Sequence, residues 1–257
     1  MLKSLDLSGR VAVVVGGTSG LGRVIAVGLA EGGADVIPTG RRAELVREVS
    51  SEIGRLGRRT LAEACDVGDR ASIDRLRDRA LQEFGHIDVL INAAGRIARK
   101  PTRDLPENEW TEIMDTNVTG CLRTCQSFYA PLAANGRGRI VNICSLNSYV
   151  ALKEVAAYAA SKSALLSMTR SLAVEWSPAG INVNGIAPGV FRTDLNKGLL
   201  DGTDRGRELL LRTPIKRFGR LEEVVGAAVF LSSDAASFVT GECIVVDGGF
   251  LASGVNS

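Results

Sequence analysis

The feature that most constrains the fold of this chain is a glycine-rich turn between an apolar run and an amphipathic run near the N-terminus. Residues 11–15 are apolar and mostly β-branched, which is typical of a strand buried on both faces of a parallel sheet. The turn reads Gly16-Gly-Thr-Ser-Gly-Leu-Gly22, and apolar residues then recur at helical spacing. Such a unit can cradle the pyrophosphate of a dinucleotide, because glycines let the backbone approach it and the helix N-terminus presents free N–H groups. A tight turn that binds nothing is the alternative.

Short apolar runs and longer helical patterns alternate along the rest of the chain. Strands are predicted at residues 11–15, 35–39, 60–65, 87–92, 139–144, 181–187 and 243–246, and helices at residues 20–32, 41–55, 70–84, 106–134, 155–177 and 221–231. This alternation predicts an α/β fold, a doubly wound Rossmann-type sheet of seven parallel strands with helices on both faces. The chain has 257 residues and no linker or internal repeat, which is consistent with a single dinucleotide-binding domain over residues 1–257.

Composition excludes several classes of protein. The chain has 31 Lys and Arg against 29 Asp and Glu, so its net charge of +2 creates no strong field toward nucleic acid. No apolar run approaches the roughly 20 residues of a membrane span, and the N-terminus lacks a secretory signal, which predicts a cytoplasmic protein. The five cysteines have spacings that suit neither a disulfide framework nor a metal site, so no metal is expected; they are Cys65, Cys121, Cys125, Cys144 and Cys243.

A second informative stretch is Tyr158-Ala-Ala-Ser-Lys162, in a segment with a helical pattern. Four helical residues turn about 400°, so the phenol and the ammonium share one face, roughly 6 Å apart along the axis. A nearby Lys⁺ favours the phenolate form of a tyrosine, which suits Tyr158 to proton exchange near neutral pH. The one histidine of the chain, His86, falls in a turn before a predicted strand, which leaves Tyr158 as the best acid–base candidate. Taken alone, such a pair also occurs by chance on many helices.

Further motifs stand in the order and at the spacings typical of one family. They are the Gly-x-x-x-Gly-x-Gly turn, Asn92-Ala-Ala-Gly95 after the fourth predicted strand, Ser145 thirteen residues before Tyr158, and Pro188-Gly189 after the sixth strand. Together with the Tyr158–Lys162 pair, they make the chain resemble the short-chain dehydrogenases/reductases over nearly its whole length. Val15 and Ala93 depart from the family pattern, which often has Thr and Asn there, and this puts only local hydrogen bonding in doubt.

The resemblance implies a catalytic group and a cofactor site. Tyr158 exchanges the proton, and Lys162 holds the ribose hydroxyls and assists Tyr158. Ser145, at the end of a predicted strand, can donate to the substrate oxygen, with a capping serine as the alternative. Asn117 matches the fourth catalytic position, where a helix backbone carbonyl binds a water of the proton relay. The cofactor contacts are then Gly16, Thr18, Ser19, Gly20, Leu21, Gly22, Arg41, Arg42, Asp66, Val67, Asn92, Gly95, Tyr158, Lys162, Pro188, Gly189, Val190 and Thr193.

Simpler roles stay open for three of these groups. From the sequence alone, Asn117 is an ordinary polar residue of a helix. Asp66 matches the position that contacts adenine, and a helix N-cap is its alternative. The residues from Pro188-Gly189 to Thr193 match the position that contacts the carboxamide of the cofactor. The alternative is that Pro-Gly only forms a turn.

The residues at the end of the second predicted strand indicate which of the two nicotinamide cofactors is preferred. A carboxylate there binds the adenosine ribose of NAD and repels a 2′-phosphate. Here the strand ends in Gly40-Arg41-Arg42, which removes the acid and offers a guanidinium suited to phosphate. We therefore expect NADP(H) to be preferred, with NAD(H) as a second cofactor. The alternative is that both arginines are solvated residues at a helix start.

The expected reaction is reversible hydride transfer between a nicotinamide and a carbonyl or secondary alcohol. Among the family branches, the chain resembles gluconate 5-dehydrogenase-like enzymes of sugar acids most, through residues 141–145, residues 183–189 and the Arg99-Lys100 pair. A 3-oxoacyl-[acyl-carrier-protein] reductase is the first alternative. A non-catalytic nucleotide-binding regulator is the second, although it would not require Ser145 or Tyr158. The candidate substrate contacts are Arg99, Lys100, Asn147 and Arg192. The alternative for the three basic residues is that they are solvated and bind no ligand.

Two further expectations concern coverage of the site and assembly. Residues 191–217 break the alternation and resemble the substrate-covering segment of the family, with a plain surface excursion as the alternative. The helices at 106–134 and 155–177 are rich in Ala and Leu. In the family such helices pair between subunits, and the C-terminal strand region packs across a second interface. The resemblance therefore predicts a homotetramer, with a dimer as the fallback.

Overall fold

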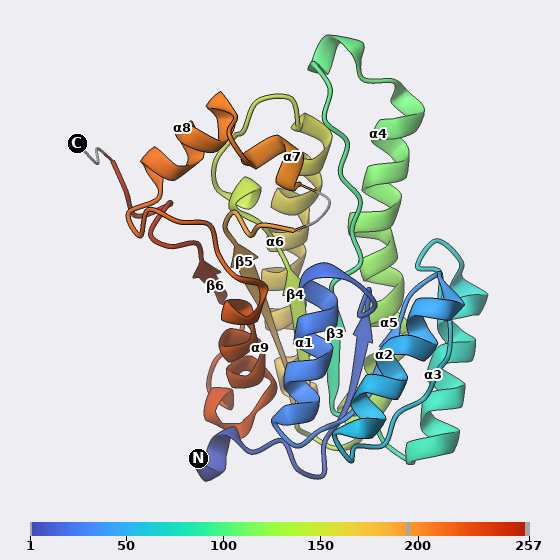
Figure 1. The fold of residues 1–257 in the computed structure, drawn as a ribbon. Helices are drawn as coiled ribbons and strands as arrows, with labels where there is room; N and C mark the ends of the chain where they lie inside the picture. Colours follow the sequence, from blue (N-terminus) through green and yellow to red (C-terminus); the bar gives the residue numbers. More distant parts are fainter. Residues whose placement is uncertain (1, 194–195, 255–257) are drawn as a thin grey trace.

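The structure, a computed structural model, describes residues 2–193 and 196–254. Its centre is a sheet of six parallel strands in the spatial order β2-β1-β3-β4-β5-β6 (Figure 1). The strands are β1 (Val11–Val15), β2 (Asp35–Thr39), β3 (Val89–Asn92), β4 (Gly138–Ile143), β5 (Ile181–Pro188) and β6 (Cys243–Val246). The Rossmann-type architecture is thus confirmed, although the number of strands is not.

Helices cover both faces of this sheet, and Figure 1 shows α1 and α9 in front of the strands and α5 and α6 behind them. The helices are α1 (Gly20–Glu31), α2 (Ala43–Arg55), α3 (Arg70–Phe84), α4 (Glu107–Met114), α5 (Gly120–Ala134), α6 (Ala156–Trp176), α7 (Lys197–Leu200), α8 (Asp204–Arg212) and α9 (Val225–Ser232). Within the described ranges, no helix has the length and apolar character needed to cross a membrane.

The core is divided between two layers by the alternation of side chains along each strand. Val11, Val13 and Val15 of β1 pack with residues of α3, α5 and α6. Ala12 and Val14, on the opposite face, pack with residues of α1, α2 and α9. Successive side chains of a strand point to opposite faces, so a strand buried on both faces must be apolar at every position. This is why β1 was recognisable as a continuous apolar run.

The predicted seventh strand at residues 60–65 is not formed, which corrects the sheet to six described strands. The segment before it does reach the edge of β2, because the N–H of Val36 donates to the carbonyl of Arg59 at 3.1 Å. Every second residue of a strand directs its backbone N–H toward the same neighbouring segment. The N–H of residue 38 should therefore donate the next hydrogen bond to residues 60–65. Position 38 is Pro38, which has no N–H. The ladder is therefore interrupted at its centre, and the segment stays irregular.

Two predicted regions contain more structure than expected. The helix predicted at 106–134 is divided into α4 and α5 by a π-helical turn, Asp115–Thr119, which contains Asn117. Such turns are rare and are frequent at functional sites. The segment 191–217 contains the two short helices α7 and α8, and its residues 194–195 lie outside the described residues.

The connections define where a ligand can bind. From β1 the chain passes to β2 on one side, and later strands are added on the other side, starting with β3. The strand order therefore reverses beside β1. In open parallel sheets, ligands bind outside the carboxyl ends of the strands at such a point.

Candidate active site

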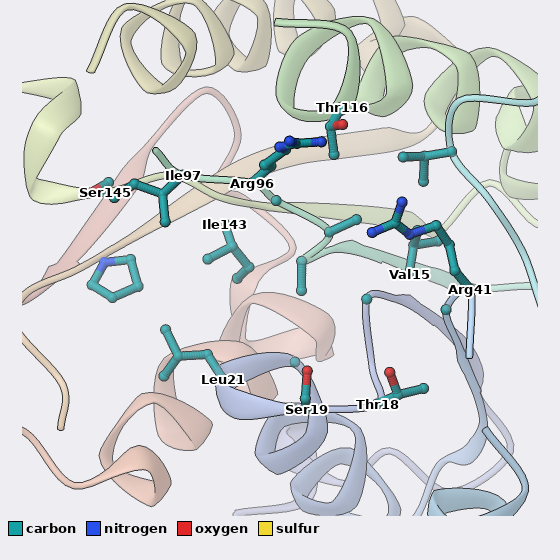
Figure 2. A pocket seen from close by; sticks show the side chains of 18 of the residues that line it. Val15, Thr18, Ser19, Leu21, Arg41, Arg96, Ile97, Thr116, Ile143 and Ser145 are labelled. Carbon is teal, nitrogen blue, oxygen red and sulfur yellow. The ribbon is translucent and has the colours of Figure 1, made fainter. Parts of the chain in front are cut away.

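A cleft of about 850 Å³ lies at the carboxyl ends of the strands where their order reverses. Figure 2 shows Ser145 and Ile97 toward one end of it, Arg41 toward the other, and Thr18 and Ser19 along one side. The predicted residues that line it are Gly16, Thr18, Ser19, Leu21, Gly22, Arg41, Arg42, Asp66, Val67, Gly95, Ser145, Tyr158, Lys162, Pro188, Gly189 and Thr193. Residues far apart in the sequence thus converge on one cleft.

The glycine turn packs its backbone closely against its surroundings. Gly16 has a φ of +82°, in the left-handed region that L side chains rarely adopt. A Cβ added there would lie 2.4 Å from the backbone N of Ala94, in the loop after β3. A Cβ added to Gly22 would lie 2.1 Å from the carbonyl O of Gly16. Only glycine fits at both positions, so the turn, the loop and the start of α1 stay in close contact.

The N-terminus of α1 lies within this glycine turn. Ser19 is the N-cap residue, yet its side chain makes no capping hydrogen bond in the part of the chain that the structure describes, and the first turn contains no acidic residue. The first N–H groups of a helix have no intrahelical partner, and the dipole adds partial positive charge there. Because Ser19 and Leu21 line the cleft, these N–H groups are placed to bind a phosphate.

One end of the cleft is cationic. Arg41 and Arg42 both line it and both are exposed. Arg42 Nη2 lies 3.5 Å from Ser19 Oγ, whereas Arg41 has no ion-pair partner among residues 2–193 and 196–254. Gly40 has no side chain, and an added Cβ would lie 3.0 Å from Thr18 Oγ1. The guanidinium of Arg41 is therefore available to an anionic ligand.

Ser145, Tyr158 and Lys162 reach the other part of the cleft from two elements. Ser145 follows the end of β4 by two residues, and Tyr158 and Lys162 lie one turn apart on α6. Lys162 Nζ is 5.6 Å from the centroid of the Tyr158 ring and donates to the carbonyl of Ile143 at 2.6 Å. The bond to Ile143 anchors a buried ammonium beside the phenol.

Ser145 both caps a turn and faces the cleft. Its Oγ accepts the N–H of Asn147 at 3.2 Å, at the start of the 3₁₀ turn Leu146–Ser148. A hydroxyl that accepts a hydrogen bond keeps its own proton, so Ser145 can still donate to a substrate oxygen. The capping role and the proposed catalytic role of Ser145 are therefore compatible.

Asn117 lies behind the wall of the cleft. Its Oδ1 accepts the N–H of Arg96 at 2.7 Å, and its Nδ2 donates to the carbonyl of Arg96 at 2.9 Å. Nδ2 also donates to Ser161 Oγ on α6 at 2.9 Å. The buried side chain thus ties the loop after β3 to the helix that carries Tyr158. The water-binding role of the Asn117 backbone carbonyl stays a prediction.

The residues after position 64 supply another wall of the cleft. Asp66 Oδ1 accepts the N–H of Gly68 at 2.9 Å, while Asp69 is the residue that caps α3. The N-cap alternative for Asp66 is therefore wrong. Cys65 lines the same wall, and burial raises the pKa of its thiol to about 11, so it is protonated at neutral pH.

Three of the predicted cofactor residues lie outside the lining. Asn92 is buried, and its Nδ2 donates to Asn142 Oδ1 at 2.9 Å, which joins β3 to β4. Gly20 lies in the first turn of α1 without lining the cleft. Val190 lines a separate pocket of about 140 Å³.

The four candidate substrate contacts are also outside the lining, and each has a partner within the chain. Arg99 pairs with Glu154 at 2.7 Å, Lys100 with Glu109 at 2.7 Å and Arg192 with Asp201 at 2.6 Å, and Asn147 donates to the carbonyl of Val150 at 3.3 Å. The sequence shows which cations follow Gly95, but only the fold brings carboxylates to them. Their role toward substrate stays untested.

The lining also contains residues that the sequence reasoning did not select as contacts. Most of them lie at or just after the end of a predicted strand. Because ligands bind at the carboxyl ends of parallel strands, the strand predictions could have indicated these residues. Thr116 lies in the π-helical turn, for which the sequence has no clear signal. These residues are Val15, Gly40, Cys65, Ala93, Ala94, Arg96, Ile97, Thr116, Ile143 and Cys144.

The cleft fits a nicotinamide dinucleotide. Its volume lies within the range of about 300–1,000 Å³ that is usual for cofactor sites. Among residues 2–193 and 196–254, the helix N-terminus beside the glycine turn has no side-chain cap, and Arg41 toward one end of the cleft has no ion-pair partner. A Ser–Tyr–Lys group lies elsewhere in the cleft. Phosphate, ribose and a reacting carbon therefore each have matching groups in one continuous cleft.

Chelators should leave the protein active. In the described part of the chain, no group of three or more His, Cys, Asp or Glu side chains could hold a metal ion. Ser145, Tyr158 and Lys162 can transfer the proton and stabilise the substrate oxygen without a metal ion. We expect turnover to be unchanged after prolonged dialysis against EDTA. Activity that is lost and then restored by one added divalent ion would contradict this expectation.

A doubly wound parallel sheet, a glycine cradle at its switch point and a Ser–Tyr–Lys group define a class of nicotinamide-dependent oxidoreductases. The family model described as Enoyl-(Acyl carrier protein) reductase matches residues 15–251. Gluconate 5-dehydrogenase of Gluconobacter oxydans is 38% identical over 248 residues, 96% of this chain and 97% of that protein. The chain belongs to the short-chain dehydrogenase/reductase family and is an oxidoreductase.

Two other relatives bear on cofactor and substrate. NAD-dependent glycerol dehydrogenase of Listeria innocua is 38% identical over 248 residues, 96% of each chain. A crystal structure of a gluconate 5-dehydrogenase from Burkholderia cenocepacia in complex with NADP and tartrate has a TM-score of 0.94 and 35% identity, and the match covers 98% of this chain and 99% of that one. Relatives of similar identity thus differ in the cofactor and substrate that their names give.

Proposed function

We propose that this protein catalyses reversible hydride transfer between NADP(H) and a ketone or secondary alcohol of a sugar acid, as gluconate 5-dehydrogenases do. The observation that carries the proposal is the presence of Ser145, Tyr158 and Lys162 in the same cleft as the glycine turn. Simple nucleotide binding does not require this group. Residues 1–257 would act as one dinucleotide-binding unit, with 191–217 covering the substrate. The cytoplasmic location expected from the sequence stays a prediction.

The proposed mechanism assigns one task to each side chain. NADP(H), when bound, supplies or accepts the hydride. Tyr158 Oη gives its proton to the substrate oxygen during reduction and takes it back during oxidation. Ser145 Oγ donates a hydrogen bond to the same oxygen and stabilises its developing negative charge. Lys162, anchored on the carbonyl of Ile143, holds its ammonium 5.6 Å from the centroid of the Tyr158 ring and would hold the ribose hydroxyls of the cofactor.

Asn117 has a supporting task in this mechanism. Its side chain holds the loop after β3 against α6, and its backbone carbonyl is proposed to bind a water that returns the proton to Tyr158. Cofactor positioning is assigned to the cleft-lining residues of the glycine turn and to Arg41, Asp66 and Thr193, which also line the cleft.

The substrate class is supported by the relatives. Gluconate 5-dehydrogenase matches over almost the whole chain, and the solved gluconate 5-dehydrogenase was in complex with tartrate, a hydroxy acid. An acyl-carrier-protein substrate is the second candidate, because the matching family model carries the description of an acyl-carrier-protein reductase.

A substrate panel tests the proposal. Oxidation of NADPH and of NADH should be followed with keto sugar acids, dihydroxyacetone, acyl thioesters and cyclic ketones. We expect kcat/KM to be highest with NADPH and a keto sugar acid. Preference for the acyl thioester would favour the second candidate. Tight NADPH binding without turnover of any carbonyl would instead support a nucleotide-binding regulator.

We also propose that the protein is a homotetramer. Val174 of α6 is 81% exposed and Phe238, shortly before β6, is fully exposed, and these two regions are the ones expected to pair between subunits. These two exposed apolar side chains lie in the regions at which subunits of the family pair, and this coincidence supports the proposal. Light scattering at micromolar concentration should give four times the chain mass of 27.2 kDa. A monomer would refute the proposal, and Phe238→Glu should reduce the mass to that of a dimer.

A further inference from the structure

Glu154 has an unusual backbone conformation close to the active site. Its φ is +71°, and Lys216 is the other non-glycine residue with a positive φ in the described ranges. The left-handed region disfavours residues with a Cβ, so such a residue persists only where its surroundings hold it. Glu154 precedes α6 by two residues and Tyr158 by four.

Two contacts hold Glu154 to the loop that follows β3. Its backbone carbonyl accepts the N–H of Lys100 at 2.9 Å. Its carboxylate accepts Arg99 Nε at 2.7 Å, and both side chains are more than half buried, at 23% and 39% exposure. A single strained residue thus connects the segment before Tyr158 to two consecutive residues of another loop.

The same loop is held at its other end by Asn117. Both the N–H and the carbonyl of Arg96 bond to the side chain of Asn117, at 2.7 and 2.9 Å. Between the two attachments lies Ile97, which lines the cleft and is more than half exposed. In the view of Figure 2, Ile97 and Ser145 both lie toward the same end of the cleft. The part of the cleft wall that contains Ile97 is therefore a short strap, residues 96–100, with one fixed point at each end.

We propose that Glu154 is a positioning residue that sets the affinity for substrate by fixing this strap against the helix of Tyr158. In this arrangement Arg99 acts through Glu154 and not as a direct ligand of a substrate carboxylate. Arg41, the expected contact to the phosphate on the adenosine ribose, lies toward the other end of the cleft from Ile97. Only the kinetic part of this inference rests on the proposed function.

The kinetic test uses the carbonyl substrate with the highest turnover in the panel. Glu154→Ala should raise its KM by about three- to tenfold, the scale expected for loss of a partly exposed charged contact, with kcat and the Kd of NADPH within about twofold of the wild type. Glu154→Gln keeps an acceptor for Arg99 and should restore most of the affinity. An unchanged KM in Glu154→Ala, or a matching loss of kcat and NADPH binding, would overturn the proposal.

A double-mutant cycle separates positioning from direct binding. If Arg99 acts through Glu154, Arg99→Met should raise KM as much as Glu154→Ala does, and the double variant should be no worse than either. If Arg99 itself binds the substrate, Arg99→Met will have the larger effect and the two effects will add. That result would overturn the positioning role.

A second measurement does not require a known substrate. Hydrogen exchange of the full-length protein with NADPH bound should become faster at residues 96–100 in Glu154→Ala and stay unchanged around the glycine turn. Glu154→Gly accommodates the positive φ but also removes the carboxylate, so exchange in the strap should increase in this variant as it does in Glu154→Ala. Unchanged exchange in the strap would overturn the proposal even if the panel identifies no substrate. Faster exchange without any turnover would instead count only against the proposed function.

Discussion

Replacing Tyr158 by phenylalanine should lower kcat by at least about 100-fold while leaving the Kd of NADPH nearly unchanged. The substitution removes one oxygen and keeps the ring whose centroid lies 5.6 Å from Lys162 Nζ. No other tyrosine lines the cleft among the described residues, so no phenol there can replace the lost proton donor. Steady-state kinetics and fluorescence titration with NADPH measure the two quantities.

The chain offers a matched control for this substitution. Tyr129 lies on α5, packs edge-to-face against Trp176 and does not line the cleft. Tyr129→Phe removes the same atom and should leave kcat close to that of the wild type. Near wild-type turnover in Tyr158→Phe would refute the proposed proton donor.

Replacing Arg41 by alanine should weaken NADPH binding by about tenfold or more and leave NADH binding nearly unchanged. The two cofactors differ by a phosphate on the adenosine ribose. A charge-assisted hydrogen bond to it is worth roughly 1.5–3 kcal/mol, or about one to two decades in affinity. Arg41 lines the cleft and has no ion-pair partner among the described residues, so its charge is available. Titration of both cofactors against the variant measures the effect.

Two comparison variants sharpen this test. Arg47→Ala removes an exposed arginine of α2 that pairs with Glu44 outside the cleft, and it should change neither affinity. Arg42→Ala should have a smaller effect than Arg41→Ala, because Arg42 already contacts Ser19. If the wild-type protein binds NADH more tightly than NADPH, both arginines are solvated residues and the expected preference is wrong.

Gly40→Asp should move the preference toward NADH. A carboxylate at this position repels the 2′-phosphate and can bind the ribose hydroxyls. The structure adds a condition, because the new Cβ would lie 3.0 Å from Thr18 Oγ1, so the Thr18 side chain must shift by a few tenths of an ångström. The ratio of the two dissociation constants in the variant measures the change.

Most of the architecture was predictable because its signals are local. The bounds of β1, β2 and α3 agree with the predictions, since a buried strand must be apolar throughout and a helix must repeat its apolar positions. The glycine turn was equally readable, because only residues without a Cβ fit where Gly16 and Gly22 meet neighbouring backbone. The helical spacing of Tyr158 and Lys162 placed both side chains on one face in the same way.

The sequence by itself therefore determined the class of fold, the position of the glycine turn and the shared helix face of Tyr158 and Lys162, which depend on contacts within a few residues. Tertiary structure alone decided the features that depend on which segments become neighbours. Pro38 ends the sheet at six described strands only because the missing N–H faces residues 58–65. The sequence does not show which carboxylates pair with Arg99 and Lys100, whereas the fold places Glu154 and Glu109 beside them. Such pairings are set by the packing of whole elements, and no pattern along the chain encodes them locally.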